Sequence, residues 1–135
     1  MPSSKPAKVL VVDDDSNIVE IIAQLLSPFD CQIEKAFDGV EAVAKANVSA
    51  PDLVITGQMM PRMTGIEAAL KILQSHPQCR FIFATSNAAN TDFLDQYTAA
   101  GFDRRLLLGK PFTRAELFDV LAICGLPQFH KQARG

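Results

Sequence analysis

Short apolar runs alternate with longer amphipathic segments along this chain. Five runs have the length and the apolar content of buried strands: residues 7–13, 31–36, 52–56, 81–85 and 106–109. After each run, apolar residues recur three and four positions apart, as on one face of a helix, beginning near residues 16, 38, 65, 91 and 113. Five strand–helix units in succession predict an α/β fold, a doubly wound parallel sheet with helices on both faces.

Residues that favour helix ends flank several of these segments. Ser16, Asp38 and Thr113 are predicted N-caps, because a side-chain oxygen there can accept a hydrogen bond from a free backbone N–H of the first turn. Pro28 and Pro77 are predicted to end the first and third helices. The helix boundaries are thus expected close to these five positions.

Length and composition are those of one globular domain. The chain has 135 residues, of which 48% are hydrophobic and 21% charged, with a formal net charge of −2 at pH 7. We expect the domain to span residues 7–125, between an N-terminal tail of residues 1–6 and a C-terminal tail of residues 126–135. The three cysteines are too far apart for a zinc motif, so we expect them to be small buried or half-buried residues.

The same composition argues against two classes of partner. No basic excess indicates nucleic-acid binding, and no polybasic stretch indicates binding to a membrane surface. The apolar runs are far shorter than the roughly 18 residues of a membrane-spanning helix. The first residues contain no apolar region of the kind found in signal peptides. We therefore expect a cytoplasmic protein that binds neither nucleic acid nor membrane.

Polar side chains follow the ends of three predicted strands. Asp13 and Asp14 follow the first strand, Thr85 ends the fourth, and Lys110 with Pro111 follows the fifth. In an open parallel sheet the carboxyl ends of the strands lie along one edge, and the loops there form the functional crevice. We therefore expect these residues to gather at that edge of the sheet, which we call the rim.

The third strand also ends at the rim, but at Gly57, which has no side chain. The segments that follow the strands resemble the response-regulator receiver domain of two-component signalling. The resemblance covers residues 7–124 and rests, in chain order, on Asp13 and Asp14, Met60 and Pro61, Gly65, Thr85, and Lys110 and Pro111. In that family an aspartate stands at the position of Gly57 and accepts a phosphoryl group. The chain is therefore similar to a receiver domain that lacks its phosphoacceptor.

The resemblance implies a flavodoxin-like (βα)5 fold with the strand order 2-1-3-4-5. It also implies a set of ligands for Mg²⁺. Asp14 would bind the ion directly, Asp13 would bind it through water, and the backbone carbonyl of Met59 would be a third ligand. Because Gly57 removes one carboxylate, we expect Mg²⁺ binding to be weak and no cofactor to be required.

The resemblance further implies that Lys110 contacts a phosphoryl oxygen or, without phosphate, pairs with an acidic residue, and that Thr85 bonds the phosphoryl group. Where the family usually has an aromatic residue three positions before the lysine, this chain has Leu107. From Gly101 to Lys110 the chain advances nine positions where the family commonly advances seven. We therefore predict extra residues in the fifth strand, a bulge at Gly109, and no switch of the usual threonine–aromatic type.

A group of aromatic and basic residues lies in and after the fourth helix: Phe93, Tyr97, Phe102, Arg104 and Arg105. The group has two interpretations. It is either a solvated edge of the domain or a docking surface, since arginine and aromatic side chains are enriched at interface cores. On the second interpretation, a histidine kinase, a phosphotransfer or output protein, or a second copy of the chain docks on the face made by the fourth helix, the fifth strand and the fifth helix.

Three functions remain as hypotheses. The first is a receiver-type signalling domain that acts by protein–protein interaction without conventional phosphorylation of an aspartate, and not as an enzyme. The second is a phosphorylatable receiver that uses a nonstandard acceptor. The third, a small enzyme on a flavodoxin-like fold, is disfavoured because the chain has no Gly-rich phosphate-binding loop, no nucleophile elbow and no base predicted beside a nucleophile.

Overall fold

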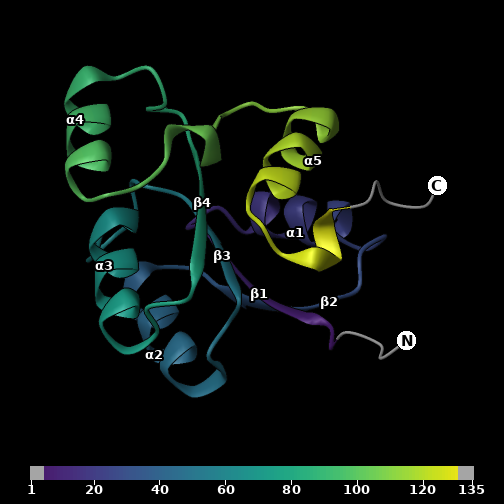
Figure 1. Cartoon of the computed structure of the whole chain (residues 1–135). Coiled ribbons are helices and arrows are strands. Elements are labelled where there is room, and N and C mark those ends of the chain that lie inside the picture. The colour runs from purple at the N-terminus through teal and green to yellow at the C-terminus, as the bar shows by residue number, and fades with distance from the viewer. Residues whose placement is uncertain (1–4, 131–135) are drawn as a thin grey trace.

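Five parallel strands form one sheet in the computed structural model, which describes residues 5–130 (Figure 1). The strands are β1 (Ala7–Val12), β2 (Cys31–Ala36), β3 (Leu53–Thr56), β4 (Arg80–Thr85) and β5 (Leu107–Gly109). Their order is β2-β1-β3-β4-β5, and every neighbouring pair is parallel. The α/β class, the doubly wound flavodoxin-like sheet and its strand order are therefore confirmed.

Helices cover both faces of this sheet. They are α1 (Ser16–Leu25), α2 (Gly39–Ser49), α3 (Gly65–Ser75), α4 (Thr91–Ala99) and α5 (Arg114–Ile123). The helices α1 and α5 pack on one face, and α2, α3 and α4 pack on the other (Figure 1). Two short 3₁₀ helices are η1 (Arg104–Leu106), before β5, and η2 (Pro127–Phe129), after α5. None of the helices within residues 5–130 combines the length and the apolar content that a membrane span needs.

Alternate residues of the central strands supply two apolar layers. On β1, Val9 and Val11 belong to the layer under α1 and α5, whereas Leu10 and Val12 belong to the layer under α2, α3 and α4. All four residues of β3 are buried. Burial on both faces explains why these strands read as continuous apolar runs rather than as alternating ones. The layers fix the sheet and therefore the loops at its carboxyl edge.

The helix starts follow the sequence with one exception. Asp38 and Thr113 cap α2 and α5 as predicted, since each side chain accepts a hydrogen bond from the backbone N–H three residues later, at 2.7 and 3.1 Å. The prediction for Ser16 is wrong, because it is the first residue of α1 and Asp15 is the N-cap. The Asp15 carboxylate accepts a hydrogen bond from Asn17 N–H, a free N–H of the first turn, at 2.9 Å. The cap therefore lies one position before Ser16.

The segment before β5 also departs from the prediction. The strand has only three residues, and the additional chain length forms η1, which the Asp103 carboxylate caps. Gly109 does not form a bulge, because it pairs with Thr85 in regular parallel register. A 3₁₀ turn absorbs the extra residues ahead of the strand, so the hydrogen-bond ladder itself stays regular.

The first part of the predicted C-terminal tail, residues 126–130, packs against the domain. Leu126 and Phe129 are buried, and the Phe129 ring lies 5.0 Å from the ring of Phe29 in an edge-to-face arrangement. Gln128 Nε2 donates a hydrogen bond to the carbonyl of Lys5 at 2.7 Å. Two apolar side chains thus attach this turn to the core. The remainder of the two predicted tails, residues 1–4 and 131–135, lies outside the described residues.

The three cysteines are free thiols, as expected. Cys31 is half-buried, and Cys79 and Cys124 are buried. Burial raises the pKa of the Cys79 thiol to about 12. This thiol is therefore protonated at neutral pH and is a poor nucleophile.

Candidate functional site

The loops after β1, β3, β4 and β5 meet at the rim, as the topology requires. Gly57 N–H donates a hydrogen bond to the carbonyl of Val12 at 2.9 Å, which ties the loop after β3 to the end of β1. Lys110 N–H donates to the carbonyl of Thr85 at 2.9 Å, which ties the loop after β5 to the end of β4. These backbone bonds continue the parallel ladder past the strand ends, so the rim is held by the sheet itself.

An ion pair joins two of the predicted rim residues. Lys110 Nζ lies 2.5 Å from Asp13 Oδ2. The Asp13 side chain is 3% exposed and that of Lys110 is 24% exposed. The second carboxylate oxygen of Asp13 accepts a hydrogen bond from Asp15 N–H at 2.9 Å. Both oxygens of this buried carboxylate therefore have partners, which is the condition under which a buried charge is tolerated.

Gly57 leaves the space that the Asp13 carboxylate needs. The residue is buried, and its φ is not in the left-handed region, unlike those of Gly101 and Gly125. A Cβ atom at position 57 would lie 2.9 Å from Asp13 Oδ2 and 3.5 Å from Asp13 Cγ. A carbon at 2.9 Å overlaps with the oxygen, so a side chain here would displace the carboxylate. The Asp13 carboxylate thus uses the space beside Gly57, and the backbone conformation at position 57 does not itself demand a glycine.

The donors that the receiver resemblance assigns to Mg²⁺ do not form a metal site as they stand. Asp14 and Met59 are exposed, whereas Asp13 is buried and bonded on both oxygens. Within residues 5–130, no group of three or more His, Cys, Asp or Glu side chains is arranged to hold a metal ion. Mg²⁺ demands near-octahedral oxygen coordination. With Asp13 bonded on both oxygens, the rim offers the ion fewer free carboxylates than the resemblance implies.

The remaining rim residues are tied to the neighbouring loops. Thr85 is buried at the end of β4, and its hydroxyl oxygen accepts a hydrogen bond from Asn87 N–H at 3.1 Å. Thr56 Oγ1 donates a hydrogen bond to the carbonyl of Gly57 at 2.8 Å. Pro111 follows the lysine of the ion pair through a cis peptide bond. The two threonine hydroxyls thus bond backbone groups of the loops that begin at the rim.

Gln58 is a rim residue that the sequence analysis missed. Its side chain is buried and its Oε1 accepts a hydrogen bond from Ile66 N–H at 2.9 Å, while its backbone carbonyl accepts one from Gly65 N–H at 2.9 Å. Both bonds satisfy free N–H groups in the first turn of α3. A Cβ at Gly65 would lie 2.0 Å from the carbonyl oxygen of Gly57, so α3 packs directly on this loop. A polar residue two positions after a wholly buried strand is the signal that could have indicated it.

Two aromatic residues predicted for docking belong to the core instead. Phe93 is 5% and Tyr97 0% exposed, and the half-buried Phe102 packs against them. The Tyr97 ring lies 5.1 Å from that of Phe83 and 5.4 Å from that of Phe102. The Tyr97 hydroxyl donates a hydrogen bond to the carbonyl of Asp103 at 2.9 Å, and burial raises its pKa. The surface role predicted for Phe93 and Tyr97 is therefore wrong, because their apolar area fastens α4 to the sheet.

Arg104 and Arg105 lie at the surface on η1. Arg105 Nη2 lies 2.9 Å from Asp103 Oδ2, and this hydrogen bond lowers the pKa of the Asp103 carboxyl. η1 leads directly into β5, which is an edge strand of the sheet. The exposed part of the predicted docking group therefore consists of these two arginines.

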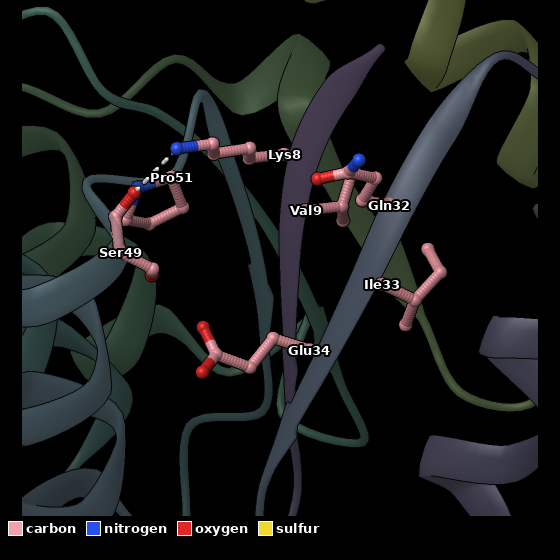
Figure 2. Close-up of a pocket in the computed structure, with 7 residues that line it drawn as sticks. All are labelled: Lys8, Val9, Gln32, Ile33, Glu34, Ser49 and Pro51. Carbon is pink, nitrogen blue, oxygen red and sulfur yellow. Dashed lines mark hydrogen bonds between the residues drawn. The ribbon is translucent and has the colours of Figure 1, made fainter.

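A cavity of about 300 Å³ lies away from the rim, near the amino-terminal ends of β1 and β2 (Figure 2). Its lining residues are Lys8, Val9, Gln32, Ile33, Glu34, Ser49 and Pro51. Lys8 Nζ donates a hydrogen bond to the carbonyl of Ser49 at 3.3 Å, as Figure 2 shows. This bond satisfies a free carbonyl at the end of α2, which is a structural role. The cavity is thus separate from the rim residues.

Comparison with known proteins finds one family along most of the chain. A family model described as the response regulator receiver domain matches residues 9–122. The transcription factor SKN7 of Chaetomium thermophilum is 35% identical over 119 residues, a match that covers 87% of this chain and 15% of the relative. The chain spans less than half of the length of the curated relatives that it matches.

Solved structures with the same fold include two that contain magnesium. A chain in the CheX–CheY–BeF3–Mg complex from Borrelia burgdorferi has a TM-score of 0.80 and 25% identity, and the match covers 90% of each chain. The receiver domain of sensor histidine kinase PA1611 from Pseudomonas aeruginosa, with a magnesium ion in its active site cleft, has a TM-score of 0.76 and 26% identity. That match covers 88% of this chain and 97% of the other.

Proposed function

This chain belongs to the response regulator receiver domain family, and we propose that it acts by protein–protein interaction without phosphorylation of an aspartate. Receiver domains are the signalling modules of response regulators in two-component systems. Their usual input is a phosphoryl group on the aspartate after the third strand. The proposal concerns how this member works without that aspartate, and a cytoplasmic location remains part of it.

One observation carries the proposal: the acceptor position is Gly57, and the lysine that would meet the phosphoryl group is already paired with Asp13 at 2.5 Å. An acyl phosphate forms on a carboxylate, and glycine has none. The Asp13 carboxylate is 3% exposed and has a partner on each oxygen, so it is a poor substitute nucleophile. We therefore expect neither an acyl phosphate nor an enzymatic activity.

The metal requirement follows from the same residues. The PA1611 receiver domain holds magnesium in its active site cleft. In this chain, Lys110 and Asp15 N–H take the two oxygens of Asp13, and Gly57 supplies no third carboxylate. A divalent cation would have to break the ion pair and would then find fewer ligands than a receiver provides. We propose that Mg²⁺ binds only weakly and is not required.

The partner is proposed to dock on the face made by α4, β5 and α5. Support for this face comes from η1, which places Arg104 and Arg105 at the surface beside the edge strand β5. Arginine is favoured at the energetic centre of interfaces, and the pairing of Arg105 with Asp103 orients its guanidinium. The CheX–CheY complex is an example of a protein complex with a chain of this fold. A histidine kinase, a phosphotransfer or output protein, or a second copy of this chain would be the partner.

Beryllofluoride tests the proposal, because it binds an aspartate carboxylate in the manner of a phosphoryl group. Backbone amide NMR spectra of the protein are recorded in the presence of Mg²⁺, before and after addition of beryllofluoride. We expect no change at the rim, whereas the Gly57→Asp variant, as the matched control, should show shifts around residue 57. Shifts at the rim of the unchanged protein that disappear in Asp13→Asn would instead identify Asp13 as a nonstandard acceptor.

A further inference from the structure

The inference concerns what replaces the missing acceptor, and it rests on the proposed function. Position 57 has an ordinary φ, yet a Cβ there would lie 2.9 Å from Asp13 Oδ2. The nearest atom to that missing Cβ is therefore a carboxylate oxygen. An acidic group is present beside position 57, but it comes from β1 and not from position 57 itself.

That oxygen is also the atom that Lys110 contacts. Lys110 Nζ lies 2.5 Å from Asp13 Oδ2, and this is the one ion pair of Lys110 within residues 5–130. Asp14 and Asp15 are exposed neighbours in sequence and do not take this place. The lysine is thus committed to the single carboxylate that fills the space beside Gly57.

The other oxygen of Asp13 holds the carboxylate in this orientation. Asp15 N–H donates to Asp13 Oδ1 at 2.9 Å, and Asp15 in turn caps α1. The start of α1 therefore fixes the position of the Asp13 side chain. Each oxygen of this carboxylate keeps a second lone pair, but a metal ion at Oδ2 would lie beside the ammonium group of Lys110 and would be repelled by its charge.

We propose that Gly57, Asp13 and Lys110 form one unit. In this unit Asp13 replaces the missing aspartate as the partner of Lys110. The ammonium group of Lys110 in turn replaces a divalent cation as the counter-charge of the Asp13 carboxylate. Glycine at position 57 leaves the room for this arrangement, since a Cβ there would lie 2.9 Å from Oδ2 and the carboxylate would have to shift. The rim is then held in one arrangement that binds a metal only weakly, and Lys110 is the residue that keeps the metal from Asp13.

Thermal unfolding of the full chain tests the coupling between Gly57 and Asp13. Gly57→Ala should lower the melting temperature by roughly 3–6 °C in the unchanged protein. In an Asp13→Ala background the same substitution should lower it by less than about 1 °C, or raise it, because the nearest oxygen to the new Cβ is then the Ala84 carbonyl at 3.7 Å and alanine restricts the unfolded chain. Gly101→Ala is the matched control, since its cost comes from a φ of +94° and should be the same in both backgrounds.

Equal losses from Gly57→Ala in the two backgrounds would overturn the proposal. If Asp13→Ala does not fold, Mn²⁺ binding followed by electron paramagnetic resonance decides the question. Lys110→Met should increase Mn²⁺ affinity at least tenfold over the unchanged protein, because it frees Oδ2 of Asp13. Unchanged Mn²⁺ affinity would show that Lys110 does not exclude the metal. The proposed function does not depend on this result, because the proposed function fails only if a phosphoryl group or its mimic binds to the protein.

Discussion

Gly57→Asp perturbs the rim most directly. The new Cβ would start 2.9 Å from Asp13 Oδ2, so the two carboxylates would be close neighbours. Two like charges ~4 Å apart repel by about 4 kcal/mol at an effective dielectric constant of ~20. Lys110 offsets part of this repulsion because it can pair with either carboxylate. We expect the variant to fold, with a free energy of unfolding lowered by about 1–3 kcal/mol in the absence of divalent metal.

Mg²⁺ should restore part of the lost free energy of unfolding in Gly57→Asp. The variant has a third carboxylate beside Asp13 and Asp14, and an ion that binds only the folded state stabilises it. With a dissociation constant of ~1 mM, ~10 mM Mg²⁺ adds about 1.4 kcal/mol. Urea unfolding of the variant and the unchanged protein, each with EDTA and with Mg²⁺, measures both effects. The unchanged protein controls for general salt effects.

Three results would refute this reasoning. Equal stability of the two proteins in EDTA would mean that a side chain at position 57 does not disturb the Asp13 carboxylate. A gain from Mg²⁺ as large in the unchanged protein as in Gly57→Asp would mean that the existing donors already form a metal site. Failure of the variant to fold would mean that the rim cannot relax around a second carboxylate.

The docking face, the α2 cap and the C-terminal turn each give a measurable outcome. Replacing Arg104 and Arg105 together by Ala should weaken partner binding or self-association by roughly tenfold, with a melting temperature lower by no more than about 2–4 °C; unchanged association in sedimentation would assign the interface to another face. Asp38→Ala should cost about 1 kcal/mol at pH 7. The Glu41 N–H lowers the pKa of the Asp38 carboxyl below 3.8, so this contribution is present above about pH 3.8 and is lost as the pH falls through the folded-state pKa, which urea unfolding across that range measures. Phe129→Ala should cost about 3 kcal/mol in urea unfolding, and a cost below ~1 kcal/mol would contradict its place in the core.

The fold was predictable from the sequence because its central strands are buried on both faces. The apolar runs within β1, β3 and β4 are buried on both faces and so have no polar face to make them ambiguous, and each is followed by a segment with helical periodicity. The strand order came from the family resemblance, since periodicity carries no information on which strands are neighbours. The caps at Asp38 and Thr113 were predictable because capping depends on local sequence alone.

The site was predictable only to the level of the topology. That Asp13 and Lys110 meet at the rim follows from their positions after parallel strands. Their direct contact, and the space that Gly57 leaves for it, depend on the rotamer of one carboxylate, which no sequence pattern encodes. Phe93 and Tyr97 were placed at the surface, although their four-residue spacing on α4 is that of a buried stripe.

Intact-mass measurement after incubation with acetyl phosphate and Mg²⁺ tests the central claim most directly, namely that this receiver domain works without an acyl phosphate. A receiver domain with an aspartate acceptor is run beside it to show that the reagent is active. The account predicts an unchanged mass for this protein at every time point at which the control is modified. A gain of one phosphoryl group that hydroxylamine removes would contradict it.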